Sequence, residues 1–159
     1  MSLKFPIKKY KLIKDFFTDY TQSLCKVLSE IDFKKLEKAS NLLEKTTLNN
    51  RNIFVCGNGG SAAIANHLVC DYIKLMRKNT KLKPKVISLS TNVELITAIS
   101  NDFSYDKIFS DQLSYLAIKG DLLFLISSSG NSKNIVNAVK FCKKNGIKTI
   151  GLCGFKGGY

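Results

Sequence analysis

"GDLLFLISSSGNSKNIVNAVK", residues 120–140, changes character twice and thereby indicates the fold class. An apolar run comes first, then small hydroxyl residues around Gly130, then apolar residues at helical spacing. This order predicts a buried strand at 121–127, a polar loop, and a helix at 132–145 that ends at Gly146. A strand followed by a helix in this way is the repeating unit of α/β folds.

The same alternation extends in both directions along the chain. Further strands are expected at 52–57, 85–90 and 147–154, and further helices at 61–76, 92–101 and 104–117. Near-continuous apolar strands alternating with helices predict a parallel sheet that carries helices on both faces.

Two amphipathic helices are expected before the sheet, one at 8–30 and one that begins after an N-cap at Asp32. Their apolar faces either cover the domain or pair with another subunit, and the pattern allows both. A chain of 159 residues suits one domain. We expect a single domain at 1–159, with the N-terminal helices at 1–50 and the α/β core at 51–159.

The composition argues against several classes of protein. No apolar run reaches the roughly 18 residues of a membrane span, and the first residues lack the apolar core of a signal peptide. A cytoplasmic location without membrane contact is therefore expected. The five cysteines form no C-x-x-C pair, so we expect them to be small buried hydrophobic residues in a reducing compartment.

The net charge of +13 has two explanations. One is a nucleic-acid-binding surface, and the other is a lysine-rich composition that also attracts a phosphorylated substrate. The densest basic stretch, 74–85, has no aromatic residues between its basic residues. This favours the second explanation, so no nucleic-acid partner is expected.

Polar loops follow three of the expected strands: GNGGSA (57–62), STN (90–92) and SSSGNS (127–132). Parallel sheets bind ligands in the crevice beyond the carboxyl ends of their strands. We therefore expect the three loops to converge on one ligand site.

The serine loop, residues 127–132, places many hydrogen-bond donors at the start of a helix. The hydroxyls of Ser127, Ser128, Ser129 and Ser132, the backbone N–H groups and the helix dipole all suit a phosphate. The other interpretation is a serine turn followed by Ser132 as a helix N-cap. That interpretation accounts for one serine more easily than for four.

The glycine loop, residues 57–62, fits G-x-G-x-x-A at Gly57, Gly59 and Ala62. However, the second strand ends without the acidic residue of a dinucleotide site, and no G-K-[ST] of a P-loop follows. The glycines either form a tight turn or bring backbone N–H groups against a polar ligand. In the second case Asn58 and Ser61 would add side-chain hydrogen bonds.

His67 and Asp71 lie four residues apart and share a helix face. Such a pair can hold a divalent metal, or the carboxylate can orient the imidazole. The structural alternative is that the single histidine of the chain is a structural residue whose polar atoms are satisfied within the fold. Two ligands are also too few for a closed zinc site. Asn101 and Asp102 form a second polar pair, whose alternative role is to end a helix.

Four motifs of the chain resemble the phosphoheptose isomerase family, sedoheptulose-7-phosphate isomerases built on the sugar isomerase (SIS) domain. They are GNGGSAAIANH (57–67), LSTNVELITAISND (89–102), the stretch 120–140 quoted above, and IGLCGFKGG (150–158). SIS domains in general share the serine loop. The glycine loop, the histidine after it and the Asn-Asp pair are similar to the heptose branch.

The resemblance implies a flavodoxin-like, three-layer α/β/α fold. It also implies a cytoplasmic homotetramer with its amino-terminal helices in a central bundle, active sites near subunit interfaces, and zinc as a cofactor. The implied activity converts sedoheptulose 7-phosphate to D-glycero-D-manno-heptose 7-phosphate, for bacterial surface polysaccharides such as lipopolysaccharide. In such an aldose-ketose isomerisation a base moves a proton between C1 and C2 through an enediol, while an acid polarises the carbonyl oxygen.

Site residues are also implied by position. The family's sugar-binding residues fall on Asn58, Gly59, Gly60, Asn101 and Asp102, and its phosphate-binding residues fall on Ser127, Ser128, Ser129 and Ser132. His67 falls on a zinc ligand of the family. Asp71 falls on a residue that serves as metal ligand and candidate catalytic base, and that is normally the longer glutamate.

The chain departs from the family pattern in two further ways. Leu75 stands where the family usually has an arginine. The family also continues into a last strand and helix that supply a glutamine and a second histidine, and we expect 1–159 to lack both. Two functions therefore remain open, an isomerase and a non-catalytic domain that binds a sugar phosphate.

Overall fold

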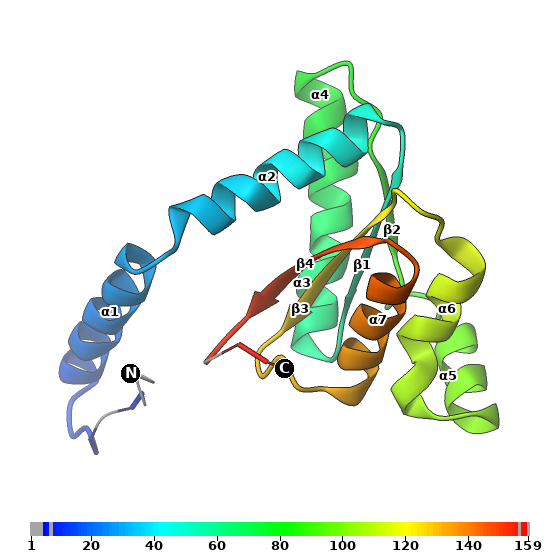
Figure 1. The fold of residues 1–159 in the computed structure, drawn as a ribbon. Helices are drawn as coiled ribbons and strands as arrows, with labels where there is room; N and C mark the ends of the chain where they lie inside the picture. The colour runs from blue at the N-terminus through cyan, green and yellow to red at the C-terminus, as the bar shows by residue number, and fades with distance from the viewer. Residues whose placement is uncertain (1–4, 7, 156, 159) are drawn as a thin grey trace. The chain divides into compact units, whose positions relative to one another are not determined.

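The structure is a computed structural model that describes residues 5–6, 8–155 and 157–158. The chain forms two compact units, one up to Ser40 and the other from Asn41 onward. Figure 1 traces the helices and strands of both units along the chain.

The first unit contains α1 (Ile13–Ser29) and the beginning of α2 (Phe33–Leu48). The predicted cap of α2 is confirmed. Asp32 accepts hydrogen bonds at Oδ1 from the backbone N–H groups of Lys34 at 3.1 Å and Lys35 at 3.2 Å. These bonds satisfy two of the N–H groups that the first turn of a helix leaves without a partner.

Helix α1 begins at Ile13, later than the predicted residue 8. The preceding segment packs its aromatic rings on the helix instead of extending it: the rings of Phe5 and Tyr10 lie 5.2 and 5.3 Å from that of Phe16. No residue of α1 is buried. Its exposed large apolar residues are Ile13, Phe17, Tyr20, Leu24, Val27 and Leu28.

The second unit is built on a sheet of four parallel strands in the order β2-β1-β3-β4. The strands are β1 (Asn52–Gly57), β2 (Lys85–Ser88), β3 (Leu122–Ser127) and β4 (Lys148–Cys153). This is the strand order of the flavodoxin-like fold, as predicted. All four predicted strands are present. Strand β2 ends at Ser88 because Ser88 Oγ accepts a hydrogen bond from the backbone N–H of Ser90 and turns the chain.

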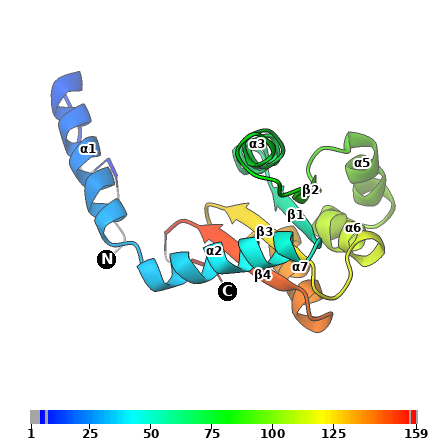
Figure 2. The ribbon, with the colours of Figure 1, turned by 90° about the horizontal axis from the view of Figure 1, so that it is seen from above.

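Helices cover both faces of the sheet. Besides the end of α2, the helices of this unit are α3 (Gly60–Asp71), α4 (Arg77–Asn79), α5 (Val93–Asp102), α6 (Ile108–Leu116) and α7 (Lys133–Lys144). A π-helical turn, Tyr72–Met76, joins α3 to α4, and a 3₁₀ turn, Tyr105–Lys107, leads into α6. Figure 2 shows α3 on one face and α5, α6 and α7 on the other, which confirms the three-layer prediction.

The main core lies between the sheet and the three helices α5, α6 and α7. Side chains that alternate along β1 and β3 meet apolar residues of these helices there; the cluster includes Phe54, Cys56, Leu123, Leu125, Ile99, Ile108, Leu113, Ile135 and Ala138. Both faces of β1 and β3 are buried, which explains their near-continuous apolar sequences. Helix α7 ends as predicted, since Gly146 has φ +68° and the next N–H, of Ile147, bonds Cys142 O at 2.9 Å.

The expectation that all cysteines are buried is wrong for three of them. Cys56 and Cys142 are buried, and burial raises the pKa of the Cys142 thiol to about 12. Cys25, Cys70 and Cys153 are exposed, since they lie on α1, α3 and the edge strand β4. Within the described residues, none of the helices is long and apolar enough to cross a membrane.

Candidate functional site

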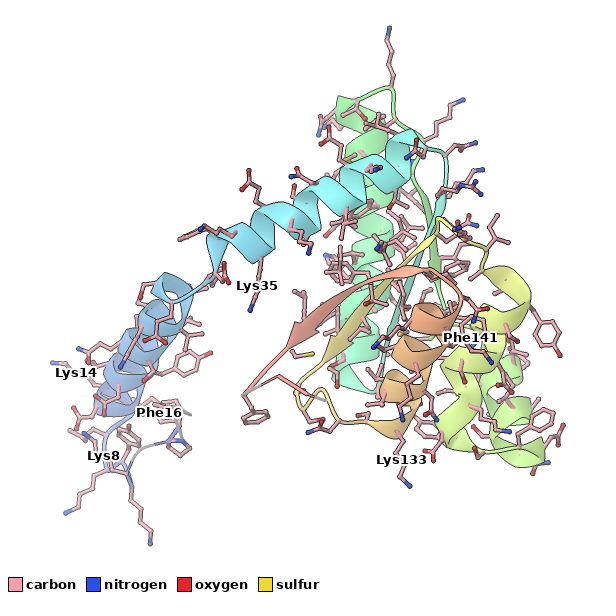
Figure 3. The ribbon with its side chains drawn as sticks, viewed as in Figure 1. Lys8, Lys14, Phe16, Lys35, Lys133 and Phe141 are labelled. Carbon is pink, nitrogen blue, oxygen red and sulfur yellow. The ribbon has the colours of Figure 1, made fainter. Side chains whose placement is uncertain are left out.

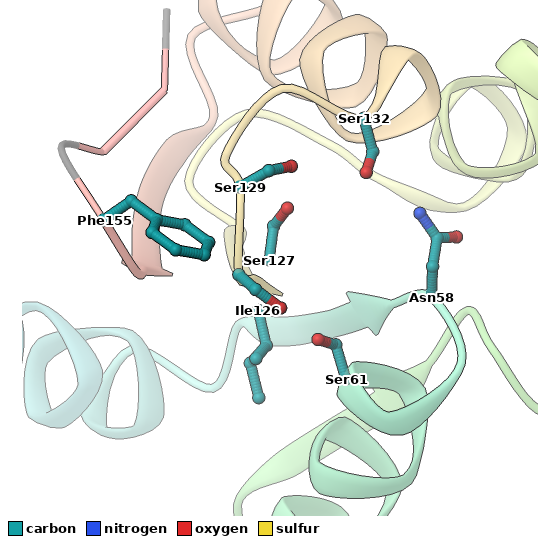
Figure 4. A pocket seen from close by; sticks show the side chains of 8 residues that line it. Asn58, Ser61, Ile126, Ser127, Ser129, Ser132 and Phe155 are labelled. Carbon is teal, nitrogen blue, oxygen red and sulfur yellow. The ribbon is translucent and has the colours of Figure 1, made fainter. Parts of the chain in front are cut away.

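A pocket opens where the central strands end. It is lined by Asn58, Ser61, Ile126, Ser127, Ser128, Ser129, Ser132 and Phe155 (Figure 4). Strands β1 and β3 are hydrogen-bonded neighbours whose ends pair Gly57 with Ile126. The glycine loop and the serine loop therefore meet beside each other, as the sequence predicts.

The third predicted loop, STN, supports the pocket but does not line it. Ser90 Oγ accepts a hydrogen bond from the backbone N–H of Gly57 at 3.3 Å and donates one to Gly57 O at 3.0 Å. Asn92 caps α5 instead of facing a ligand, because its Oδ1 accepts from Leu95 N at 2.8 Å. The STN loop thus fixes the end of β1, and the expectation that it joins the ligand site directly is wrong.

Two hydroxyls of the serine loop hold the loop in shape. Ser127 Oγ accepts from Gly130 N at 3.1 Å, and Ser129 Oγ accepts from Asn131 N at 3.2 Å. The structural interpretation, a serine turn, is thus correct for these two serines. It does not compete with ligand binding, because a hydroxyl that accepts a hydrogen bond keeps its own hydrogen for donation.

The serine loop is also packed against the chain that follows β4. Gly130 has φ +67°, and a Cβ atom added there would lie 2.7 Å from Gly158 Cα. The backbone N–H of Gly154 bonds Ser128 O at 2.9 Å. These contacts leave no space for a side chain at Gly130 and fix the loop on that side.

Ser132 occupies the N-cap position of α7, but its side chain makes no capping hydrogen bond. The prediction that Ser132 caps this helix with its hydroxyl is therefore wrong. Figure 4 shows the hydroxyl turned toward the pocket. The start of α7 thus offers its N–H groups and its positive dipole end next to the pocket.

The glycine loop turns tightly because α3 starts directly over it. A Cβ atom at Gly57 would lie 2.5 Å from Ser61 O, and Gly59 has φ +52°. Gly59 and Gly60 form this turn and are not among the residues that line the pocket, whereas Asn58 and Ser61 are. The tight-turn interpretation is therefore correct for Gly57 and Gly59, and ligand binding by Asn58 and Ser61 stays a prediction.

The amide of Asn58 is held by two residues that sequence reasoning missed. Asn58 and Asn134 exchange a pair of hydrogen bonds, each 2.9 Å long, and Tyr105 OH donates to Asn58 Oδ1 at 3.0 Å. Two lining residues, Ile126 and Phe155, were also missed. The rule that placed the loops at strand ends would have found both, since Ile126 is the second-last residue of β3 and Phe155 follows β4.

The other predicted site residues lie outside this pocket. Asn101 and Asp102 are at the end of α5, exposed, where Asn101 Nδ2 donates to Asp102 Oδ1 at 2.9 Å. On α3, His67 Nε2 lies 3.5 Å from Asp71 Oδ2, with the two side chains 74% and 48% exposed. The pair shares a helix face as predicted, and it faces solvent in this chain.

Comparison with known proteins identifies the family. The family model for the SIS domain matches residues 16–154. A phosphoheptose isomerase of Aliarcobacter butzleri is 42% identical over 94% of this chain and 78% of its own length. This chain belongs to the phosphoheptose isomerase family of SIS domain proteins. A Helicobacter pylori phosphoheptose isomerase is 39% identical, over 92% of this chain and 76% of its own length.

Solved structures lead to the same family. The phosphoheptose isomerase of Neisseria gonorrhoeae superposes with a TM-score of 0.80 and 31% identity, over 91% of this chain and 74% of that one. The enzyme of Francisella tularensis gives a TM-score of 0.79 and 29% identity, over 92% and 75%. The fold and the helices before the sheet are thus those of phosphoheptose isomerases.

The zinc site that the resemblance implies is incomplete among the described residues. They contain no group of three or more His, Cys, Asp or Glu side chains that could hold a metal ion. His67 and Asp71 supply two ligands, and a catalytic zinc ion normally has three from the protein. The described residues of one chain therefore do not form a complete zinc site by themselves.

We expect the 159-residue chain to bind Zn²⁺ weakly, and His67→Ala to reduce this binding about tenfold or more, because it removes one of two ligands. Competition with a chromophoric chelator measures both affinities. Cys70→Ser, on a neighbouring position of α3, is the matched control and should leave the affinity unchanged. Tight stoichiometric binding that survives His67→Ala would contradict this assignment.

Proposed function

We propose that this protein is a phosphoheptose isomerase that converts sedoheptulose 7-phosphate to D-glycero-D-manno-heptose 7-phosphate. Its relatives at about 40% identity carry that name. The observation that carries the proposal is the pocket itself, where serine hydroxyls surround the start of α7. We place the reaction in the cytoplasm, in the supply of heptose for bacterial surface polysaccharides such as lipopolysaccharide.

The phosphate of the substrate binds in the serine loop. Ser127, Ser129 and Ser132 each retain a hydroxyl hydrogen that can be donated to a phosphate oxygen, and the N–H groups of α7 add to these. Each such charge-assisted bond contributes on the order of 1.5–3 kcal/mol. Lys133, the first residue of α7 (Figure 3), is not counted among these partners, because its Nζ lies 3.8 Å from Asp106 Oδ2.

The sugar extends from the phosphate past Asn58 and the start of α3. Asp71 is the proposed base, but it lies ten residues beyond Ser61, which is about 15 Å along a helix. The carbon chain of a seven-carbon sugar has six bonds of about 1.5 Å and spans about 9 Å at most. We therefore propose that His67 and Asp71 act on a substrate held in the pocket of a neighbouring copy.

This arrangement requires a homo-oligomer, which we propose to be a tetramer. The apolar residues of α1 support it, because six large apolar side chains of one helix are exposed. Burying each of them in an interface contributes about 1.5–3 kcal/mol. Asn101 and Asp102, also exposed, stay predicted ligands of the sugar hydroxyls, and zinc binding by His67 and Asp71 stays a prediction.

Replacing Phe17 and Leu24 together by glutamate should dissociate the oligomer, since two charges would then have to be buried in the α1 interface. Light scattering at micromolar concentration measures the mass of both proteins. The control is Lys14→Glu with Lys26→Glu, which introduces two glutamates on the same helix without replacing an apolar residue. A wild-type protein that is a monomer at this concentration would contradict the proposal.

Ser132→Ala should raise the dissociation constant for sedoheptulose 7-phosphate about tenfold, through loss of one charge-assisted bond. The fold should stay intact because this hydroxyl does not cap α7. Calorimetric titration measures the affinity, and formation of heptose 7-phosphate measures turnover. Ser114→Ala on α6, whose hydroxyl bonds Asp111 O, is the control.

The same two measurements separate the two function classes. Binding together with turnover supports the isomerase. Binding without turnover would instead support a non-catalytic sugar-phosphate-binding domain. Equal affinity for sedoheptulose 7-phosphate and for unphosphorylated sedoheptulose would contradict the phosphate site itself.

A further inference from the structure

The amide of Asn58 is fixed by a chain of four hydrogen bonds that begins at the backbone. The N–H of Ile135, in the first turn of α7, donates to Asn134 Oδ1 at 2.9 Å. Asn58 Nδ2 donates to the same oxygen, and Asn134 Nδ2 donates back to Asn58 Oδ1. Tyr105 OH then donates to Asn58 Oδ1 at 3.0 Å.

This hydrogen-bond network determines the orientation of both amides, that is, which terminal atom of each is the oxygen. A pair of asparagine amides that bond only each other could turn over together without loss. Here the N–H of Ile135 can only donate, so the atom of Asn134 that it meets must be the oxygen. The partner atom on Asn58 must then be the nitrogen, and its oxygen must lie toward Tyr105.

One hydrogen of the Asn58 nitrogen is engaged by Asn134, and the nitrogen carries a second. Asn58 lines the pocket, and Figure 4 shows its nitrogen on the side of Ser132. A nitrogen in this place donates to a ligand oxygen, whereas an oxygen there would repel a phosphate. The direction of one amide therefore decides whether Asn58 attracts or repels the ligand.

We propose that Asn134 and Tyr105 are positioning residues, which hold the Asn58 amide with its nitrogen toward the pocket so that it donates to an oxygen of the bound sugar phosphate. This inference rests on the proposed function. Asn134 is 2% exposed and neither residue lines the pocket, so both act through Asn58. Tyr105 is 53% exposed and is not part of the main core cluster, so its hydroxyl can be removed without loss of the fold.

Tyr105→Phe removes only the hydroxyl that donates to the oxygen end of the amide. We expect its dissociation constant for sedoheptulose 7-phosphate to rise about three- to tenfold, as for the loss of one hydrogen bond. In an Asn58→Ala background the same change should have no further effect, because Tyr105 acts only through Asn58. Tyr115→Phe, at a position 90% exposed on α6, is the matched control and should change neither affinity.

The side-chain amide signal of Asn58 gives a second, independent measurement. In ¹H–¹⁵N spectra, assigned by its loss in Asn58→Ala, the NH₂ signal should shift when sedoheptulose 7-phosphate is added. The shift should be smaller in Tyr105→Phe at equal saturation. A purely structural role of Tyr105 would not change this signal at saturation.

These experiments distinguish a failure of this inference from a failure of the proposed function. Wild-type protein that binds no sedoheptulose 7-phosphate overturns the proposed function, and this inference with it. Normal wild-type binding that Tyr105→Phe leaves unchanged overturns this inference alone. An equal effect of Tyr105→Phe with and without Asn58 also overturns it, because Tyr105 would then act by another route.

Discussion

Parallel pairing of β1 with β3 is the constraint on which the site depends. The two strands run side by side from Ile53 opposite Leu122 to Gly57 opposite Ile126, with both faces buried. Because they are parallel and in register, both turn into their loops at the same edge of the sheet. The starts of α3 and α7 are thereby placed on opposite sides of one pocket, and Asn58 bonds Asn134 across 76 residues of sequence.

In the proposed phosphate site, loop shape and ligand binding use the same atoms of the serine loop. Ser127 and Ser129 accept hydrogen bonds from their own loop, which leaves their hydrogens for a phosphate and holds the oxygens in place beforehand. Ser132 lies at the start of α7 without capping it with its side chain. A site that is formed before its ligand arrives loses less entropy on binding.

The sequence predicted the four strands, the α/β class and six of the eight pocket-lining residues, because strand ends and polar loops are local patterns. It did not predict what depends on distant packing. Tyr105 and Asn134 were missed because their role arises only when segments far apart in sequence meet at Asn58. Cys25, Cys70 and Cys153 were misplaced because an apolar pattern does not say which face of an element is covered.

A crystal structure of the protein with sedoheptulose 7-phosphate is the most direct test of the account. The account predicts phosphate oxygens within hydrogen-bonding distance of the Ser132 hydroxyl, at least one of Ser127 and Ser129, and the first N–H groups of α7. It also predicts the Asn58 nitrogen, not its oxygen, on the ligand side. A phosphate bound elsewhere, with the serine loop in contact only with solvent, would contradict the central claim.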